Sequence, residues 1–189
     1  MSVQGHRHWI VQIYRLASLA LALMCCTLLP VSARANPTES ELRAAVIVAI
    51  MRFTTWPQAG PAAPPEIQVC LAGSPNSASH LLRVSGQQKV AGRTLQVKSI
   101  AGTLVQDCQV LVLGDDLNRE RFITLVHNAD HHSILTICDG CDRIRLEDTI
   151  IHLTLRKQRV NFEVNLAKAK SNGLALDAQL LELASVVRK

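Results

Sequence analysis

The sequence predicts a single α/β domain, with a mixed central sheet of about six strands flanked by helices in a Rossmann-like sandwich. Short apolar runs of strand type alternate with segments of helical spacing, which is typical of strands joined by helices. Two runs, residues 110–113 and 134–137, are almost wholly apolar, so both faces of these strands should be buried. Residues 149–155 and 159–166 flank Lys157 and Gln158 and predict an antiparallel hairpin near one edge of the sheet.

The first 35 residues have the three-part composition of a secretion signal. A basic opening precedes an apolar run over residues 16–29, and Ala33 and Ala35 supply the small-x-small pattern that signal peptidase requires. This run is shorter than the roughly twenty residues of a membrane-spanning helix. A retained membrane anchor is the alternative reading. We therefore expect a signal peptide over residues 1–35, cleaved after Ala35, and a mature domain over residues 36–189 in the periplasm.

Removing that segment changes the charge of the protein. The whole chain has 20 basic and 15 acidic residues and a net charge of +5. Arg7, Arg15 and Arg34 would leave with the signal peptide, so the mature domain would have 17 basic residues against 15 acidic ones, a net charge of +2. This charge is small and its cations are dispersed, which argues against nucleic acid as a partner.

The mature domain is predicted to open with a helix. Thr38 and Ser40 are candidate N-caps, and Glu39 and Glu41 place negative charge in the first turn. One buried face is predicted from apolar residues at helical spacing, namely Leu42, Val46, Ile50 and Phe53. The pair Trp56-Pro57 is predicted to end the helix, because a residue before proline is pushed out of the helical region.

Strands and helices then follow in alternation. A strand is predicted at residues 67–71, a helix at 76–85, a half-exposed strand at 94–100 and a buried strand at 110–113. A helix at 118–129 and a buried strand at 134–137 come next, followed by the hairpin and a final helix at 177–187. These elements account for the predicted sandwich.

Four cysteines would remain after export: Cys70, Cys108, Cys138 and Cys141. An even number of cysteines in an exported protein indicates disulfides, and three pairings are open. Cys70 lies inside the first apolar strand and Cys108 lies just before the strand at 110–113. Their side chains come within disulfide reach if those two strands are close neighbours in the sheet. Two buried free thiols are the alternative.

The segment Cys138-Asp139-Gly140-Cys141 fits a redox centre, half of a zinc site, or a structural or redox-sensitive disulfide. Redox enzymes place the first cysteine at a helix N-terminus, whereas this pair follows a strand and Asp-Gly favours a turn. Zinc needs four ligands, and only His131 and His132 lie nearby in the sequence. We therefore expect a disulfide here, with no metal and no cofactor.

The sequence contains none of the common catalytic motifs of serine hydrolases, zinc proteases, dinucleotide-binding enzymes or P-loop enzymes. The turn at Asp115 and Asp116 is interpreted as a solvated turn in preference to a cation site. His127 and His152 are interpreted as surface or core histidines. The sequence thus predicts a binding protein that is not an enzyme.

Several segments of the chain resemble the YfiR family. The first helix ends in the family's basic–aromatic–x–x–Trp–Pro signature, which here is Arg52-Phe53-Thr54-Thr55-Trp56-Pro57. The segments 159–166, 173–174 and 180–187 resemble the family's last strand and terminal helix. Residues 67–71 and 108–113 match its two cysteine-bearing strands, and Gly92-Arg93 matches a turn before a strand. The likeness spans essentially the whole mature chain.

The resemblance implies a periplasmic repressor. Family members bind the periplasmic region of an inner-membrane diguanylate cyclase and hold it inactive, which lowers cyclic di-GMP and biofilm formation. An OmpA-like outer-membrane lipoprotein can sequester the repressor. By the same match, Cys70 and Cys108 would form the family's disulfide, whereas the pair Cys138 and Cys141 departs from the better-known members. We expect such a protein to be a homodimer.

Two other functions remain open. One is a periplasmic small-molecule-binding accessory protein of a membrane sensor, with its ligand in a cleft at the carboxyl ends of the strands. The other is a thiol oxidoreductase that uses Cys138 and Cys141.

Overall fold

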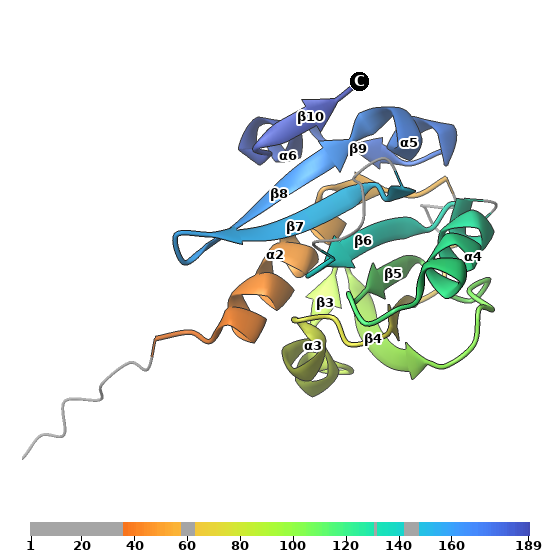
Figure 1. Ribbon diagram of the computed structural model, residues 1–189, viewed down its shortest axis with the longest axis horizontal. Coiled ribbons are helices and arrows are strands. Elements are labelled where there is room, and N and C mark those ends of the chain that lie inside the picture. The colour runs from red at the N-terminus through yellow and green to blue at the C-terminus, as the bar shows by residue number, and fades with distance from the viewer. Residues whose placement is uncertain (1–35, 58–62, 131, 142–147) are drawn as a thin grey trace, which may run out of the picture. The chain divides into compact units, whose positions relative to one another are not determined.

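The domain is built on one eight-stranded mixed sheet with the strand order β10-β8-β7-β6-β5-β2-β4-β3 (Figure 1). The computed structural model describes residues 36–57, 63–130, 132–141 and 148–189, and residues 37–189 form one compact unit. The predicted α/β class with a mixed sheet is confirmed. The predicted count of about six strands is wrong.

The strands of this sheet are β2 (Glu66–Ala72), β3 (Lys89–Val90), β4 (Arg93–Ile100), β5 (Val110–Leu113), β6 (Leu135–Asp139), β7 (Ile151–Arg156), β8 (Arg159–Asn165) and β10 (Val186–Arg188). The helices are α2 (Glu39–Arg52), α3 (Ala78–Val84), α4 (Arg119–Asp130), α5 (Leu166–Ser171) and α6 (Ala178–Leu183). A separate two-stranded sheet pairs β1 (Thr54–Thr55) antiparallel with β9 (Ala175–Leu176).

Five neighbouring strands of the main sheet, β4, β2, β5, β6 and β7, run parallel to one another. Strand β8 returns antiparallel to β7 as the predicted hairpin, and β3 is antiparallel to β4. Because the five central strands point the same way, their amino ends meet at one edge of the sheet and their carboxyl ends at the other. In open sheets of this kind, ligands usually bind outside the carboxyl ends of the strands.

Each face of the sheet has its own hydrophobic core. On one face, side chains of α2, α3 and α6 pack against alternate residues of the strands, such as Val69, Val112 and Ile137. On the other face, α4 packs over the remaining residues of β2, β5 and β6 (Figure 1). Burial on both faces explains why β5 is wholly apolar and wholly buried.

Helix α2 begins as the sequence predicts but ends earlier. Thr38 is the N-cap and forms a capping box with Glu41, because each side chain bonds the backbone N–H of the other residue. The helix ends at Arg52, four residues before Trp56, because Thr54 and Thr55 leave the helix to pair with β9.

The extra strands are short and lie at the ends of the sheet. Strands β3 and β10 have two and three residues, too few for an alternating pattern to identify them. The predicted final helix at 177–187 is wrong in its last turn, since α6 ends at Leu183. The backbone N–H of Ser185 then donates to the carbonyl of Phe162, and β10 pairs parallel with β8. Helix α5 was not predicted.

Candidate functional site

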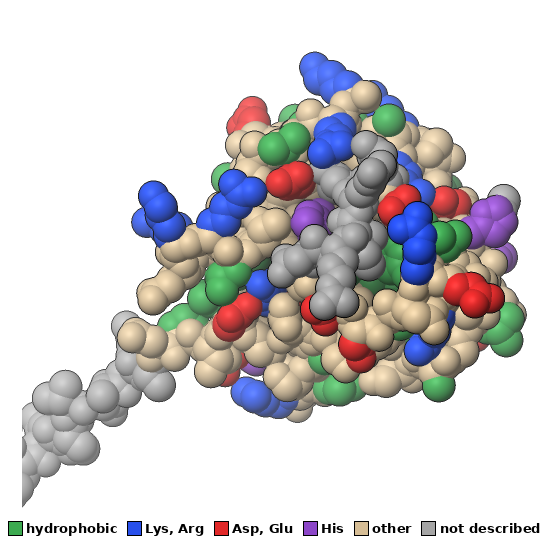
Figure 2. All heavy atoms as spheres, viewed as in Figure 1, with side chains coloured by type: hydrophobic (Ala, Val, Ile, Leu, Met, Phe, Trp, Pro, Cys, Tyr) green, Lys and Arg blue, Asp and Glu red, His purple; other side chains and the backbone are tan. Residues whose placement is uncertain are grey.

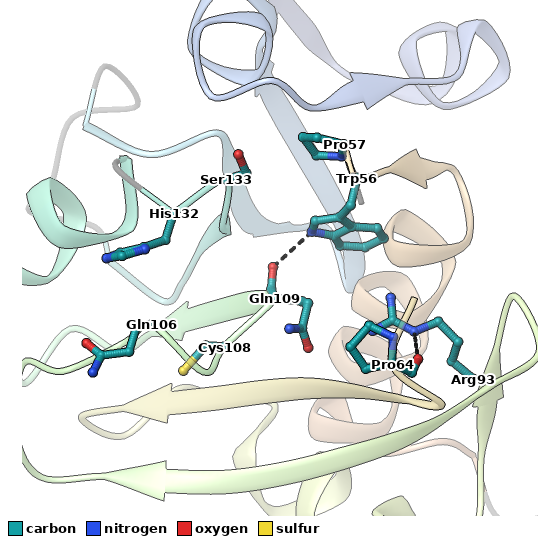
Figure 3. A pocket seen from close by; sticks show the side chains of 9 residues that line it. All are labelled: Trp56, Pro57, Pro64, Arg93, Gln106, Cys108, Gln109, His132 and Ser133. Atoms are coloured by element: carbon teal, nitrogen blue, oxygen red, sulfur yellow. Dashed lines mark hydrogen bonds between the residues drawn. The ribbon is translucent and has the colours of Figure 1, made fainter. Parts of the chain in front are cut away.

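Two adjoining cavities lie at the amino ends of the parallel strands. Their volumes are about 220 Å³ and about 510 Å³, and Trp56, Pro64 and Arg93 line both of them. Figure 3 shows the smaller cavity between the Trp56–Pro57 segment and the starts of the strands; its walls are Trp56, Pro57, Pro64, Arg93, Gln106, Cys108, Gln109, His132 and Ser133. We refer to these two hollows together as the amino-end cavity.

Two side chains that belong to separate sequence motifs meet at this cavity. The indole Nε1–H of Trp56 donates to the carbonyl oxygen of Gln109 over 3.2 Å, which fixes the ring at the start of β5 (Figure 3). The Arg93 guanidinium donates through Nε to the carbonyl of Pro64 over 2.8 Å, and through Nη2 to the carbonyl of Glu66. Burial lowers the pKa of Arg93 from its ordinary value, yet an arginine stays charged at neutral pH. The cavity therefore combines the aromatic ring of Trp56 with the Arg93 cation that two carbonyls hold in place, and Arg52 also lines its larger part.

Cys108 is part of the cavity wall and lies beside Cys70. Strands β2 and β5 are direct neighbours, with Cys70 paired in register to Leu111. The two sulfur atoms are 1.93 Å apart and the Cα atoms 5.9 Å, and both side chains are buried. Such a bridge would hold the start of β5 against β2, directly beneath the rim that carries Trp56 and Arg93.

The other cysteine pair lies at the opposite edge of the sheet. Cys138 is in β6, Cys141 follows the turn, and their sulfur atoms are 2.13 Å apart. Both side chains are at most 1% exposed and pack in the core under α4 with Leu113 and Leu125. An exchanging thiol must be reached by its substrate, so this burial argues against the thiol oxidoreductase reading.

Asp139, between those two cysteines, forms a buried ion pair with Arg43 that the sequence analysis missed. Its side chain is fully buried; Oδ1 accepts from Nη1 of Arg43 over 2.7 Å, and Oδ2 accepts from the backbone N–H of Ser77 over 2.7 Å. Nε of Arg43 in turn donates to Glu39 over 2.7 Å. The segment Asp-Gly was interpreted as a turn only. The signal that could have revealed the pair is Arg43 itself, which lies at helical spacing from the buried Ile47 and Ile50.

The carboxyl ends of β2, β5 and β6 carry loops that pack tightly against one another. A Cβ atom added at Gly114 would lie 2.5 Å from the carbonyl carbon of Ser74, and one at Gly140 would lie 2.5 Å from Nδ2 of Asn76. Asp116, predicted to be a solvated turn residue, accepts from the backbone N–H of Ser74 over 2.7 Å and from its hydroxyl over 2.8 Å. The hydrogen bond from the Ser74 backbone lowers the pKa of Asp116. The sequence analysis placed a possible ligand cleft at this carboxyl edge of the sheet. The two cavities described above lie at the amino edge instead.

The remaining candidates from the sequence are dispersed. His132 lines the amino-end cavity, His127 lies on α4 and His152 is half-buried in β7. His131 lies outside the described residues. Among the residues that the structure describes, no group of three or more His, Cys, Asp or Glu is placed to hold a metal ion. No helix in this part of the chain is long and apolar enough to cross a membrane.

The fold and the site define a class: a Rossmann-like α/β sandwich in which the four cysteines that the structure describes are buried in the framework and the cavity lies at the amino ends of the strands. Within this class, the YfiR/HmsC-like family model matches residues 40–185, and the chain belongs to the YfiR/HmsC-like family. This is a periplasmic, regulatory and non-catalytic family that acts in cyclic di-GMP signalling.

A solved structure shows the same fold. A conserved domain protein from Vibrio cholerae O1 biovar El Tor superposes with a TM-score of 0.53 at 10% sequence identity, over 82% of this chain. The chain spans 62% of the length of that structure, and at this identity the likeness concerns the fold alone. A comparison with curated proteins gave no match.

Proposed function

We propose that this protein is a periplasmic repressor that binds the periplasmic region of an inner-membrane diguanylate cyclase, lowering cyclic di-GMP and biofilm formation. The observation that carries the proposal is the match of the YfiR/HmsC-like family model over residues 40–185, which covers nearly all of the compact unit. The protein would act by being bound and not by catalysis.

Export supports this role. The secretion-signal composition of residues 1–35 predicts cleavage after Ala35, which releases the domain into an oxidising compartment. Both cysteine pairs lie at bonding distance in a framework that buries them, as expected for structural disulfides in such a compartment. An OmpA-like outer-membrane lipoprotein would then compete with the cyclase for the repressor.

The rim of the amino-end cavity is the contact surface that we propose for the cyclase. Trp56 and Arg93 are the residue types that most often dominate the binding energy of protein interfaces. Both are held by backbone carbonyls, of Gln109 and of Pro64, so little side-chain freedom is lost when a partner binds. The adjoining hollow of about 510 Å³ would accept one or two apolar side chains of the partner.

Co-purification tests this proposal directly. The exported wild-type protein, carrying an affinity tag, should retain a membrane diguanylate cyclase from solubilised membranes. Trp56→Ala should retain at least about tenfold less, the loss expected of an interface anchor. Ile123→Glu is the control, because Ile123 is exposed on α4 and does not line the cavity. This variant should bind as wild type. Absence of any cyclase in the wild-type sample would refute the proposal.

A small-molecule ligand in the same cavity is the second candidate function. The observation that favours it is the combination of an aromatic ring and a cation around a concave space, which suits an organic anion. Native mass spectrometry of the exported protein would then show a reproducible added mass that Arg93→Ala removes. A wild-type spectrum that shows the mass of the polypeptide alone, with no added ligand mass, would exclude this candidate.

A further inference from the structure

The end of the β7–β8 hairpin projects beyond the rest of the main sheet (Figure 1). Strands β7 and β8 pair with each other along the hairpin, but β6 pairs with β7 only as far as Leu153, and β10 pairs with β8 only from Glu163 onward. Residues 154–161 therefore form a two-stranded ribbon that no third strand of the described structure borders. A ribbon of this kind contributes little stability by itself.

The tip of this ribbon is strongly basic. Arg156, Lys157 and Arg159 are exposed, and we call these three residues the basic tip. Residues 154–161 contain no acid, and within the part of the chain that the structure describes no carboxylate forms an ion pair with the basic tip. The nearest acid of the hairpin, Glu163, lies about 13 Å along β8 from Arg159. Figure 2 shows Lys and Arg side chains at this projecting end.

The basic tip is costly in the free protein. Arg156 and Arg159 lie directly opposite each other in the hairpin register, and like charges in such a pair repel. The turn between them places Lys157 and Gln158 at φ values of 50° and 60°, where residues other than glycine and asparagine are uncommon. An anionic partner would offset the repulsion between the cations.

We propose that the basic tip docks the protein on a membrane surface that contains anionic phospholipids. The first reason is shape. A stable protein–protein interface buries about 800 Å² on each partner, far more than the end of a two-stranded ribbon supplies. A membrane surface is flat, so a projection rests on it without a complementary hollow. The shape therefore favours a lipid surface over a protein partner.

The second reason is charge. Lipid phosphate groups are complementary to a tip that has three cations and no acid, and each Lys or Arg near an anionic surface strengthens binding about fivefold. Leu155 adjoins the basic tip and is 40% exposed. An apolar side chain beside cations suits the boundary between lipid headgroups and acyl chains.

The place of the basic tip in the fold agrees with this docking. Strand β7 is parallel to β6 and ends at Arg156, so the tip lies at the carboxyl edge of the sheet. Helix α2 begins at the same edge, because Arg43 near its start bonds Asp139 at the end of β6 (Figure 1). The basic tip therefore lies on the side from which the chain leads back to the apolar run over residues 16–29. The amino-end cavity lies at the other edge and stays open to a partner.

Sedimentation with lipid vesicles tests this inference. At about 0.1 M salt, the exported protein should sediment with phosphatidylcholine vesicles that contain about 30% phosphatidylglycerol, and not with pure phosphatidylcholine vesicles. The variant Arg156→Gln/Lys157→Gln/Arg159→Gln should bind about 100-fold more weakly, because three contributions of about fivefold are lost together. It should remain folded, since it removes the repulsion across the hairpin. The vesicles contain no cyclase, so the result does not depend on the proposed function.

A matched variant controls for net charge. Lys89, Lys98 and Arg119 are exposed cations on β3, β4 and α4, away from the hairpin. The variant Lys89→Gln/Lys98→Gln/Arg119→Gln loses the same charge as the tip variant but should weaken vesicle binding less than about threefold, because salt screens charges distant from the surface. Circular dichroism would show that both variants are folded.

Fluorescence tests whether the tip enters the lipid. The emission of Leu155→Trp should shift to shorter wavelength on anionic vesicles, whereas that of Ile123→Trp, exposed on α4, should not. Inorganic phosphate should release the protein no more than chloride of equal ionic strength does. Release by phosphate alone would assign the tip to free phosphate and overturn the inference.

Three further results would overturn the inference. One is a wild-type protein that does not bind anionic vesicles, and another is a tip variant that binds them as tightly as the wild type. The third is retention of the wild type by native inner membranes but not by protein-free anionic vesicles, which would assign the basic tip to a membrane protein.

Discussion

Arg43 and Asp139 form a buried ion pair, with Nη1 of the arginine 2.7 Å from Oδ1 of the aspartate, that joins α2 to the carboxyl end of β6. The second carboxylate oxygen accepts from the backbone of Ser77, at the start of α3. One carboxylate thus fixes three elements that are far apart in the sequence.

Asp139→Ala should lower the free energy of unfolding by about 3–5 kcal/mol, because it leaves the buried Arg43 without its counter-charge. Urea unfolding of the exported protein measures this. Glu39→Gln is the matched control: Glu39 bonds the same arginine but its side chain is 48% exposed, so the cost should stay below about 1 kcal/mol. A loss below 1 kcal/mol for Asp139→Ala would contradict this account of the pair.

Cys70→Ala should lower the free energy of unfolding by about 2–4 kcal/mol under non-reducing conditions, since the Cys70–Cys108 bridge closes a long loop in the unfolded chain. The Cys138–Cys141 bridge closes a loop of only a few residues, so the double variant Cys138→Ala/Cys141→Ala, which removes it, should cost about 1–2 kcal/mol on the same entropic argument. If a reducing agent does not diminish the difference between wild type and Cys70→Ala, the bridge is not its cause.

Gly114→Ala should destabilise the domain by about 2–4 kcal/mol, because its Cβ would lie 2.5–2.7 Å from backbone atoms of Ser74 and Pro75 that cannot move freely. Gly102→Ala is the matched control, since nothing lies within 4 Å of its added Cβ. Thermal unfolding of the two variants compares them. Equal melting temperatures would show that the two carboxyl-end loops are not packed as described.

The contribution of Asp116 to the free energy of unfolding should decrease as the pH falls. Its pKa is lowered by the hydrogen bond from the Ser74 backbone, so the unfolded chain binds more protons near pH 3–4 and stability falls as the pH falls through the folded-state pKa. The unfolding free energy of wild type minus that of Asp116→Asn should therefore shrink between pH 5 and pH 3. The change should stay below about 1 kcal/mol, because the group is solvent-exposed. A difference that grows on acidification would contradict the assignment.

The strands and helices with a strong hydrophobic pattern could be predicted from the sequence. Several short elements and the buried side of α2 could not. Residues 110–113 matched β5 because a doubly covered strand is apolar at every position. For α2, the spacing of Leu42, Val46, Ile50 and Phe53 predicted a buried face; Ile50 is fully buried, and Val46 and Phe53 are half-buried against the same core. The spacing did not single out the residues at the centre of the contact, such as Ile47 and Met51, because a helix that is apolar all round contains no signal that selects one side.

The cavity and the ion pair depended on contacts between distant segments. Trp56 and Arg93 come from different motifs, and only the parallel order of β4, β2 and β5 brings them to one edge. Asp139 looked like a turn residue because its partner Arg43 is 96 positions away. Local propensity predicts neither contact. The short strands β3 and β10 likewise exist only because a neighbour accepts their hydrogen bonds.

The central claim is repression of a diguanylate cyclase, and the cellular level of cyclic di-GMP tests it most directly. Mass-spectrometric quantification should show that the level rises when the gene is deleted and returns to its starting value when the exported wild-type protein is supplied, but not when Trp56→Ala is supplied. A cyclic di-GMP level that stays the same after deletion and after complementation would contradict the claim.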